Sequence, residues 1–307
     1  MKVWILEKKV NFEIYENRRF KEETEKEGIE LQFVASEEFD IIATKEGKKS
    51  ILYKGSYVSL PECLIPRRGS GTTYFDLAVM RHLEKTGVFV VNSSQNVEIA
   101  KDKLQSLQML AANKIPIPKT MLAKLPLNID FVEKEFIYPL IIKTISGAHG
   151  KGVFLCDTRN QLEDFIDFME VSKDPQVNII IQEFVSSSRG KDIRVFVVGG
   201  RAIGAMLRIA KESKIKANFS AGGSVSLFEL NPAIEWLAVE STRTLGLDIA
   251  GVDILFNDVN YVVCEINSSP GFRGFEKATG LNIPQEIYRY IRVRLGSYNA
   301  KTAPNSG

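Results

Sequence analysis

The sequence is poor in the residues that bind structural zinc or act as nucleophile and base in covalent catalysis. Its 307 residues include two histidines, His82 and His149, and three widely separated cysteines, Cys63, Cys156 and Cys264. No cysteine pair has the short spacing of a zinc site, and so few histidines disfavour a Ser-His-Asp or Cys-His arrangement. We therefore expect no structural zinc, free buried cysteines in the reducing cytoplasm, and no side-chain nucleophile.

A strong net charge and a long apolar run are also absent from the sequence. The formal net charge is +2, and charged residues make up 25% of the chain. Because so balanced a chain creates no long-range attraction for polyanions, we expect no DNA partner. The apolar run at the start ends at Glu7 and is too short to span a bilayer, so we expect a buried strand and no membrane partner.

The first hundred residues alternate apolar runs with polar helical stretches. The predicted strands are Val3–Leu6, Leu31–Val34, Cys63–Pro66 and Val88–Val91, and the predicted helices are Glu16–Gly28 and Tyr74–Thr86. This alternation predicts an open α/β domain over residues 1–98. The following stretch, Val97–Ala112, predicts one continuous amphipathic helix that ends before Pro116.

Strands dominate the chain from Pro139 onward. The predicted strands are Leu140–Lys143, Val153–Cys156, Ile179–Glu183, Asp192–Val198, Ala202–Ile209, Gly251–Phe256 and Tyr261–Ile266, with helices at Gln161–Glu170 and Ala233–Thr244. Gly199-Gly200 and Asn257–Asn260 separate neighbouring strands and predict two hairpins. The polar tail, residues 296–307, shows no periodicity and is predicted to be disordered.

Two carboxylates and an amide occupy the last predicted strand pair. Asp253 lies on one strand, and Glu265 and Asn267 lie two residues apart on the next. Because side chains alternate along a strand, Glu265 and Asn267 face the same side, and Asp253 can lie opposite them across the hairpin. Magnesium prefers such oxygen ligands and shares them with nucleotide phosphates. We predict a magnesium site; the alternative is that both carboxylates are solvated strand residues.

A lysine and a glycine-rich loop lie between two predicted strands. Lys143 ends one strand, and a loop through Gly147, Gly150 and Gly152 leads into the next. Glycine allows backbone N–H groups to approach phosphate closely. The segment is not a Walker A loop, which requires Ser or Thr after its Gly-Lys pair and then a helix. It predicts either a loop that closes over a nucleotide or an ordinary hairpin loop.

The run Ile181–Val185 ends an apolar strand and precedes Asp192. Extended backbone there can pair with an adenine edge, and Asp192 can accept hydrogen bonds from ribose hydroxyls. Phe184 and Val185 fit a hydrophobic core equally well.

Phosphoryl transfer also needs positive charge. The candidate cations are Lys103, Lys143, Arg194, Arg208 and Lys211.

Taken in order along the chain, these motifs resemble the ATP-grasp superfamily. They are Asp102-Lys103-Leu104, Lys143 with its glycine-rich loop, Gln182-Glu183-Phe184-Val185, Asp192-Ile193-Arg194, Asn218, Gly222-Gly223, Asp253 and Glu265–Gly271. Residues 1–295 are similar to the RimK-type glutamate ligases, which extend the C-terminus of a small-subunit ribosomal protein. The resemblance implies a mixed α/β and α+β chain with the ATP-grasp fold: an N-terminal pre-ATP-grasp domain and two α+β lobes, residues 99–185 and 186–295, that clasp ATP.

The resemblance also assigns roles to individual residues. It implies that ATP contacts Lys103, Lys143, Gly147, Gly150, Gly152, Glu183, Phe184, Val185, Asp192, Lys216 and Asn218. It implies that the catalytic residues are Arg208, Lys211 and Asn218. It implies that magnesium is held by Asp253, Glu265 and Asn267. We expect two magnesium ions, with manganese as a substitute.

The implied activity is ATP-dependent ligation of a carboxylate and an amine through an acyl phosphate. The expected partners are ATP, an amino acid, a carboxylate acceptor and further copies of the chain in a homo-oligomer. Glutamate addition to a protein C-terminus is the first expectation. A ligase acting on a carrier protein or a small cofactor shares every nucleotide motif and stays open. A regulatory ATP-binding module predicts damaged metal ligands, whereas all three are present.

Two departures from the family pattern bear on the choice of amino acid. Arg273 stands where the family usually has an acidic or small residue, and Ser220-Ala221 replaces a more basic stretch. Both positions lie close to where we expect the amine to enter. An amino donor other than glutamate therefore stays open.

Overall fold

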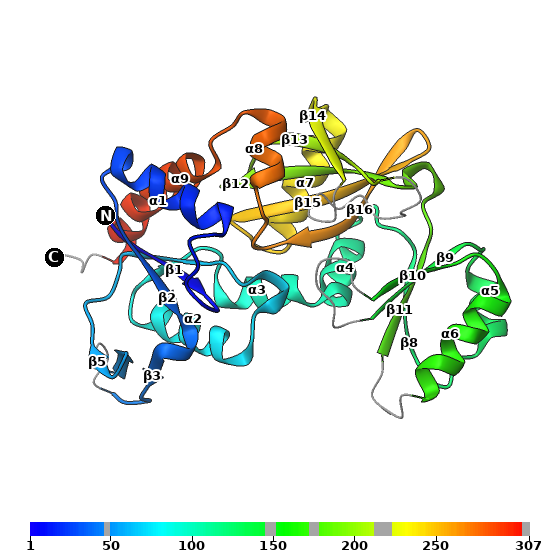
Figure 1. Cartoon of the computed structure of the whole chain (residues 1–307), viewed down its shortest axis with the longest axis horizontal. Coiled ribbons are helices and arrows are strands. Elements are labelled where there is room, and N and C mark those ends of the chain that lie inside the picture. Colours follow the sequence, from blue (N-terminus) through cyan, green and yellow to red (C-terminus); the bar gives the residue numbers. More distant parts are fainter. Residues whose placement is uncertain (46–49, 145–151, 172–177, 212–222, 303–307) are drawn as a thin grey trace.

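The computed structural model describes residues 1–45, 50–144, 152–171, 178–211 and 223–302. The chain forms an N-terminal domain, a central lobe and a C-terminal lobe, each built around its own sheet (Figure 1). The mixed α/β and α+β class predicted from the sequence is confirmed.

A parallel sheet forms the centre of the N-terminal domain. Its strand order is β2-β1-β6-β7. The strands are β1 (Lys2–Glu7), β2 (Glu30–Ala35), β6 (Cys63–Pro66) and β7 (Phe89–Val90), and the helices are α1 (Tyr15–Glu27) and α2 (Tyr74–Lys85). All three strand pairs are parallel, as an open α/β domain requires. A small antiparallel sheet, which was not predicted, adds β3 (Phe39–Ile41), β4 (Ile51–Tyr53) and β5 (Ser56–Tyr57).

The predicted single helix over Val97–Ala112 is wrong, because the chain breaks into α3 (Ser94–Lys101) and α4 (Lys103–Ala112). Asp102 between them has extended backbone angles, φ −81° and ψ 106°. Its carboxylate accepts hydrogen bonds from the backbone N–H groups of Leu104 and Gln105, at 2.9 and 3.0 Å. Asp102 therefore caps α4 and starts a new helix, which apolar periodicity alone does not reveal.

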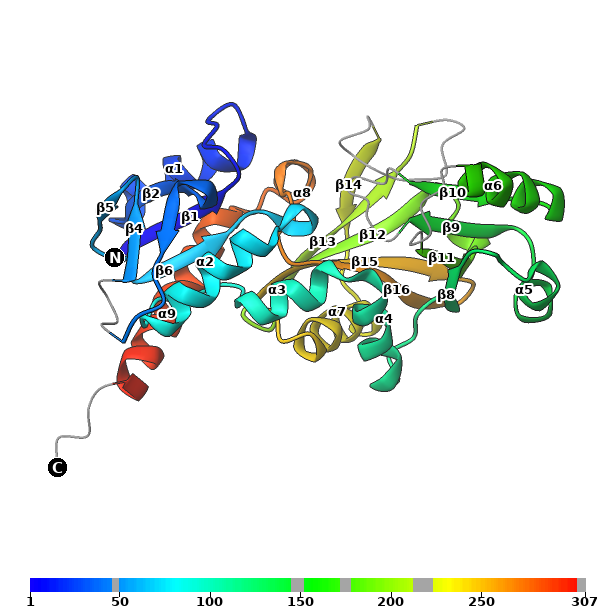
Figure 2. The same cartoon turned by 90° about the horizontal axis from the view of Figure 1, so that it is seen from below.

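The central lobe is an antiparallel sheet with two helices on one face, as Figure 2 shows. Its order is β10-β9-β11-β8. The elements are β8 (Thr120–Lys124), α5 (Ile129–Glu135), β9 (Leu140–Thr144), β10 (Val153–Cys156), α6 (Arg159–Val171) and β11 (Asn178–Glu183). Alternate residues such as Leu140 and Ile142 face the helices, where they pack against Val132 and Leu162. The opposite face of the sheet is thereby left for other contacts.

The C-terminal lobe is a five-stranded antiparallel sheet of order β14-β13-β12-β15-β16. The elements are β12 (Lys191–Val198), β13 (Arg201–Ile209), β14 (Ser224–Phe228), α7 (Pro232–Thr244), β15 (Ile249–Asn257) and β16 (Asn260–Asn267). Both predicted hairpins are confirmed. Gly199 and Gly200 turn the first with φ of 60° and 77°, angles that glycine adopts without a Cβ clash.

The lobes share cores across the expected boundaries. Leu107 and Leu110 of α4 pack with Ile193 and Val252 of the C-terminal sheet, although the sequence analysis placed these helical residues in the central lobe. Of the final helices, α8 (Arg273–Thr279) packs against β13 and β14 of the C-terminal lobe, and α9 (Ile283–Thr302) returns to the N-terminal domain. In Figure 1, α9 lies beside α1.

The prediction of a disordered tail from residue 296 is wrong as far as Thr302, where α9 ends. The helix is anchored upstream by Ile283, Ile287 and Ile291, which are fully or almost fully buried. No proline lies between Ile291 and Thr302, so the helix continues past its buried part. Residues 303–307 lie outside the described part of the chain.

Candidate active site

A large cavity of about 1270 Å³ lies where the three parts of the chain meet. The helix α4 occupies the space between the central and C-terminal lobes in both views (Figures 1 and 2). The predicted site residues that line the cavity are Lys103, Lys143, Glu183, Phe184, Val185, Asp192, Arg208, Asp253, Glu265 and Asn267. Positions far apart in the sequence are therefore brought to one space by strands of two different sheets.

The remaining predicted residues either are not part of the described cavity wall or lie outside the described part of the chain. Lys211 is exposed and does not belong to the wall, because β13 ends at Ile209 and the chain leaves the sheet. Its catalytic role stays a prediction, since the residues that follow it, 212–222, lie outside the described part of the chain. Gly152, with φ of 75°, precedes the cavity residue Val153. Outside the described residues are Gly147, Gly150, Lys216, Asn218, Ser220 and Ala221.

A buried cluster of carboxylates and guanidinium groups forms one wall. Arg194 lies across from Asp253 in the β12–β15 ladder, and its Nε and Nη2 donate to the two carboxylate oxygens at 2.6 and 2.7 Å. Arg208 reaches both acids, with Nη2 at 2.9 Å from Asp253 and Nε at 2.5 Å from Asp192. Asp253 and Arg208 are only 7% and 6% exposed, so these charges are stabilised mainly by one another.

Burial and charge act in opposite directions on the pKa values of this cluster. Burial raises the pKa of Asp192 to about 6, against the lowering effect of Arg208. Burial alone would also raise the pKa of Asp253, but Arg194 and Arg208 hold it below the usual value. Although burial opposes it, the two aspartates raise the pKa of Arg208. At neutral pH the cluster is a fully charged network.

The predicted metal ligands share the cavity but differ in their partners. Asp253 and Glu265 face each other in the β15–β16 ladder, next to a β-bulge in which Cys264 is the extra residue. Glu265 has no hydrogen bond or ion pair within the described residues, whereas both oxygens of Asp253 are engaged by arginines. The predicted magnesium site therefore has an open side, formed by Glu265 and Asn267, and a side on which arginines engage Asp253.

The donor set fits magnesium held jointly with phosphates. In the described part of the chain, no three His, Cys, Asp or Glu side chains could hold a metal ion on their own. The Nδ2 atom of Asn267 is buried without a hydrogen-bond partner, so the orientation of this amide is not fixed by the protein. A carboxylate and an amide beside open space are what magnesium uses when a nucleotide supplies further oxygens.

Lys143 lies at the end of the central sheet nearest the cluster. Its Nζ donates to Oε1 of Gln182 at 2.7 Å and lies 3.8 Å from Sγ of Cys264. Gln182 in turn donates to the hydroxyl of Thr120 at 2.8 Å. Gln182 and Cys264 therefore position the lysine, and burial raises the pKa of the Cys264 thiol, which favours the neutral form.

The N-terminal domain contributes a wall that the sequence analysis did not assign to the site. The wall is lined by Tyr15, Glu16, Arg67, Arg68 and residues 69–71. Arg67 directly follows the predicted strand Cys63–Pro66, but its place in the cavity depends on how the domain docks. Carboxyl ends of parallel strands are usual ligand positions, so the end of β6 was a usable signal.

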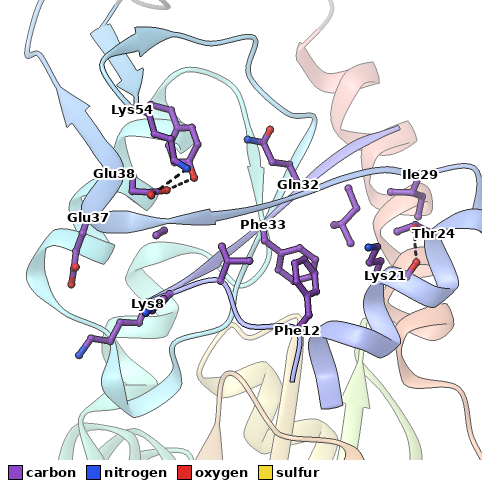
Figure 3. A pocket seen from close by; sticks show the side chains of 15 residues that line it. Lys8, Phe12, Lys21, Thr24, Ile29, Gln32, Phe33, Glu37, Glu38 and Lys54 are labelled. Carbon is purple, nitrogen blue, oxygen red and sulfur yellow. Dashed lines mark hydrogen bonds and ion pairs between the residues drawn. The ribbon is translucent and has the colours of Figure 1, made fainter. Parts of the chain in front are cut away.

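A second hollow, of about 930 Å³, lies on the N-terminal domain alone (Figure 3). It contains an aromatic pair, Phe12 and Phe33, with ring centroids 5.1 Å apart, and an ion pair between Lys54 and Glu38 at 3.3 Å. None of the predicted site residues lines it.

Among the described residues, no helix has both the length and the apolar character needed to cross a membrane.

Family models cover nearly the whole chain. Residues 1–97 match the RimK PreATP-grasp domain, and residues 100–291 match the RimK-like ATP-grasp domain. A probable alpha-L-glutamate ligase of Legionella pneumophila (strain Corby) is 36% identical over 297 residues, which cover 96% of each chain. A protein of the same description from Vibrio vulnificus (strain YJ016) is 37% identical over 308 residues, covering 100% of this chain and 98% of the relative.

Solved structures share the fold at lower identity. The ATP-grasp ligase PsnB, complexed with a phosphomimetic variant of its minimal precursor, Mg and ADP, has a TM-score of 0.75 at 19% identity, covering 95% and 98% of the two chains. The D-alanine–D-alanine ligase of Bacillus anthracis has a TM-score of 0.69 at 16% identity, covering 98% and 99%. The predicted ATP-grasp fold is confirmed. The chain belongs to the RimK-like family of ATP-grasp ligases, enzymes that form amide bonds at the expense of ATP.

Proposed function

We propose that the protein adds L-glutamate to the carboxyl group of an acceptor, with a protein C-terminus as the acceptor, through an acyl phosphate. The observation that carries the proposal is the convergence, in one cavity, of lysine, carboxylate, amide and guanidinium groups from both lobes. Glutamate is favoured because two relatives at 36% and 37% identity are described as probable alpha-L-glutamate ligases. A peptide acceptor is favoured because PsnB, which has the same fold, is complexed with a precursor peptide.

In this proposal ATP lies between the central and C-terminal lobes. Lys143 and Lys103 contact its phosphates, together with the glycine-rich loop after β9. The segment Glu183–Val185 contacts adenine from the end of β11, and Asp192 lies towards the ribose while it holds Arg208. Each of these described residues lines the cavity.

Magnesium is the expected metal of this family, and Glu265 and Asn267 are its first proposed ligands. Asp253 would be the third ligand if phosphate oxygens took its place as the partner of Arg194 or Arg208. A bound magnesium ion would offset the phosphate charge during transfer. We propose two ions, with manganese as a substitute, in a cytoplasmic homo-oligomer.

The proposed reaction has two steps. An oxygen of the acceptor carboxylate attacks the γ-phosphorus, and ADP leaves. The amino nitrogen of glutamate then attacks the acyl carbon and loses a proton, and inorganic phosphate leaves with one acceptor oxygen. Arg208 and Arg194 place positive charge beside the transferring group, and closure of the lobes excludes the water that would hydrolyse the acyl phosphate.

Release of phosphate on addition of single amino acids tests this proposal. Purified protein is incubated with magnesium-ATP and each amino acid, with and without cell extract, and acceptors are identified by mass spectrometry. We expect release that depends on glutamate and a mass increase of one or more glutamyl units. Equal release with every amino acid, or modification by a different one, would refute the choice of glutamate.

A further inference from the structure

Arg67 occupies the wall of the cavity that the N-terminal domain contributes. It directly follows β6, and its backbone N–H donates to the carbonyl oxygen of Leu6 at 2.9 Å, where two parallel strands end side by side. Ligands of open parallel sheets bind beyond these carboxyl ends. Arg67 is therefore placed for a substrate rather than for the nucleotide that the other two lobes hold.

The guanidinium group of Arg67 is fixed by three contacts. Its Nη1 donates to the carbonyl oxygen of Pro270 at 3.0 Å, in the loop that follows the metal-ligand strand. Its central carbon lies 5.9 Å from the ring centre of Phe20 and 5.7 Å from that of Phe272. Both rings are fully buried. The group is thus held in one orientation before a ligand arrives, which lowers the entropic cost of binding.

Arg67 has no ion pair with a carboxylate in the described part of the chain. The nearest acidic groups are Glu7 and Glu16, and one oxygen of each is used elsewhere: Glu7 accepts from Asn17, and Glu16 accepts from the backbone N–H of Phe272. Burial lowers the pKa of Arg67, and those two glutamates act in the opposite direction. A partly buried arginine that forms no ion pair attracts an incoming anion, and here that anion can enter from the cavity.

We propose that Arg67 binds a substrate carboxylate other than the one that is phosphorylated. The planar guanidinium group donates two parallel hydrogen bonds to a carboxylate, and only one of its N–H groups is used by Pro270. The proposal rests on the proposed function, and it specifies that the substrate is a dicarboxylate. Arg273, whose central carbon lies 5.9 Å from the ring centre of Tyr15 in the same wall, adds a second, more exposed positive charge.

The carboxylate can come from the incoming glutamate or from an acidic acceptor terminus. The probes that distinguish them are L-glutamate against L-glutamine, and a synthetic peptide ending in glutamate against the same peptide ending in glutamine. Arg67→Met removes the positive charge. Arg67→Lys keeps the charge but lacks the planar guanidinium group that donates two parallel hydrogen bonds. Arg81→Met is the matched control, because Arg81 also lies over an aromatic ring, at 5.6 Å from Tyr74, but outside the cavity.

Steady-state kinetics and calorimetric binding in the presence of magnesium-ADP are measured for each probe. We expect Arg67→Met to raise KM and Kd about 10- to 100-fold for the acidic form of one probe, with the KM for ATP within about twofold. Wild-type protein with the glutamine form of that probe should behave in the same way. Arg67→Lys should recover part of the affinity, and Arg81→Met should match the wild type.

Unchanged affinity for both acidic probes in folded Arg67→Met, checked by circular dichroism, would overturn the role of Arg67. An equal rise in the KM for ATP would overturn it too, because it would indicate general damage to the cavity. If Arg67→Met does not fold, an affinity of Arg67→Lys for both acidic probes equal to that of the wild type would overturn the role of Arg67 instead. If the wild type binds an acidic probe but forms no ADP from ATP, the ligase proposal is refuted. The calorimetric comparison of wild type and Arg67→Met then still decides whether Arg67 binds the carboxylate. No binding of either probe by the wild type refutes both.

Discussion

Asp253 on β15 and Glu265 on β16, two of the proposed magnesium ligands, differ in whether their substitution should affect stability as well as activity. Asp253 neutralises the buried Arg208 and the partly buried Arg194, whereas the carboxylate of Glu265 has no hydrogen-bond or ion-pair partner among the described residues. We expect Glu265→Gln to lower ATP turnover by about 10²- to 10³-fold while the melting temperature stays unchanged. Phosphate release and a thermal melt measure both quantities, with the exposed Glu235→Gln as control. Turnover close to that of wild type at saturating magnesium would show that Glu265 is not a ligand.

Asp253→Ala should abolish turnover and also weaken the fold, since it leaves Arg194 and Arg208 without their shared acceptor. Loss of one partner from a buried ion pair costs about 3–5 kcal/mol. Urea denaturation of the variant gives the change in the free energy of unfolding. A variant as stable as the wild type would contradict the buried network.

The pH dependence of turnover follows from Asp192. Its pKa is raised to about 6, so it gains a proton as the pH falls through about 6 and ceases to attract Arg208. We expect kcat to fall on the acid side of this value, and Asp192→Asn to remove that limb of the profile at a lower overall rate. A wild-type kcat that stays level from about pH 8 down to about pH 5 would rule this out.

At the scale of elements, the junction between α3 and α4 depends on one side chain. Asp102→Ala removes two hydrogen bonds to backbone N–H groups of α4 and should destabilise the protein by about 1 kcal/mol. Because Lys103 begins α4, the KM for ATP should rise as well. Asp102→Asn preserves the cap and is the control in denaturation and kinetic assays. Equal stability of the Ala and Asn variants would contradict the cap.

The elements also indicate how far local sequence patterns determine this structure. The β12–β13 hairpin was predictable, because alternating apolar residues flank two adjacent glycines with positive φ. The pairing of Arg194 with Asp253 was not, because β12 and β15 are distant in sequence and their register is set by the whole sheet. The docking of Arg67 against Pro270 likewise depends on contact between separate domains. Local patterns and the family resemblance therefore pointed to residues of the two lobes that line the cavity, but not to the wall that the N-terminal domain supplies.

At the scale of the whole molecule, the N-terminal domain and the C-terminal lobe share one core. Phe275 of α8 packs against Phe196 of β12 with ring centres 5.3 Å apart, in a cluster that includes Val3 and Phe20. We expect Phe275→Ala to lower the free energy of unfolding by about 3–5 kcal/mol. The exposed Phe168→Ala should change it by no more than about 0.5 kcal/mol in the same urea titration.

Because that core joins the two parts, Phe275→Ala should also destabilise them together. Probes in the N-terminal domain, such as Trp4, and in the C-terminal lobe, such as Trp236, should report the same transition midpoint. Single-tryptophan variants separate the two signals. A shift of only one midpoint would mean that the shared core does not couple the domains.

The acyl-phosphate route is tested most directly by following the oxygen atoms of the acceptor. A peptide whose terminal carboxylate carries ¹⁸O is incubated with the protein, magnesium-ATP and glutamate, and the phosphorus products are analysed by mass spectrometry. The two proposed steps predict ADP and inorganic phosphate that contains one ¹⁸O atom for each amide bond formed. Release of pyrophosphate with ¹⁸O in AMP, or of phosphate without label, would contradict them.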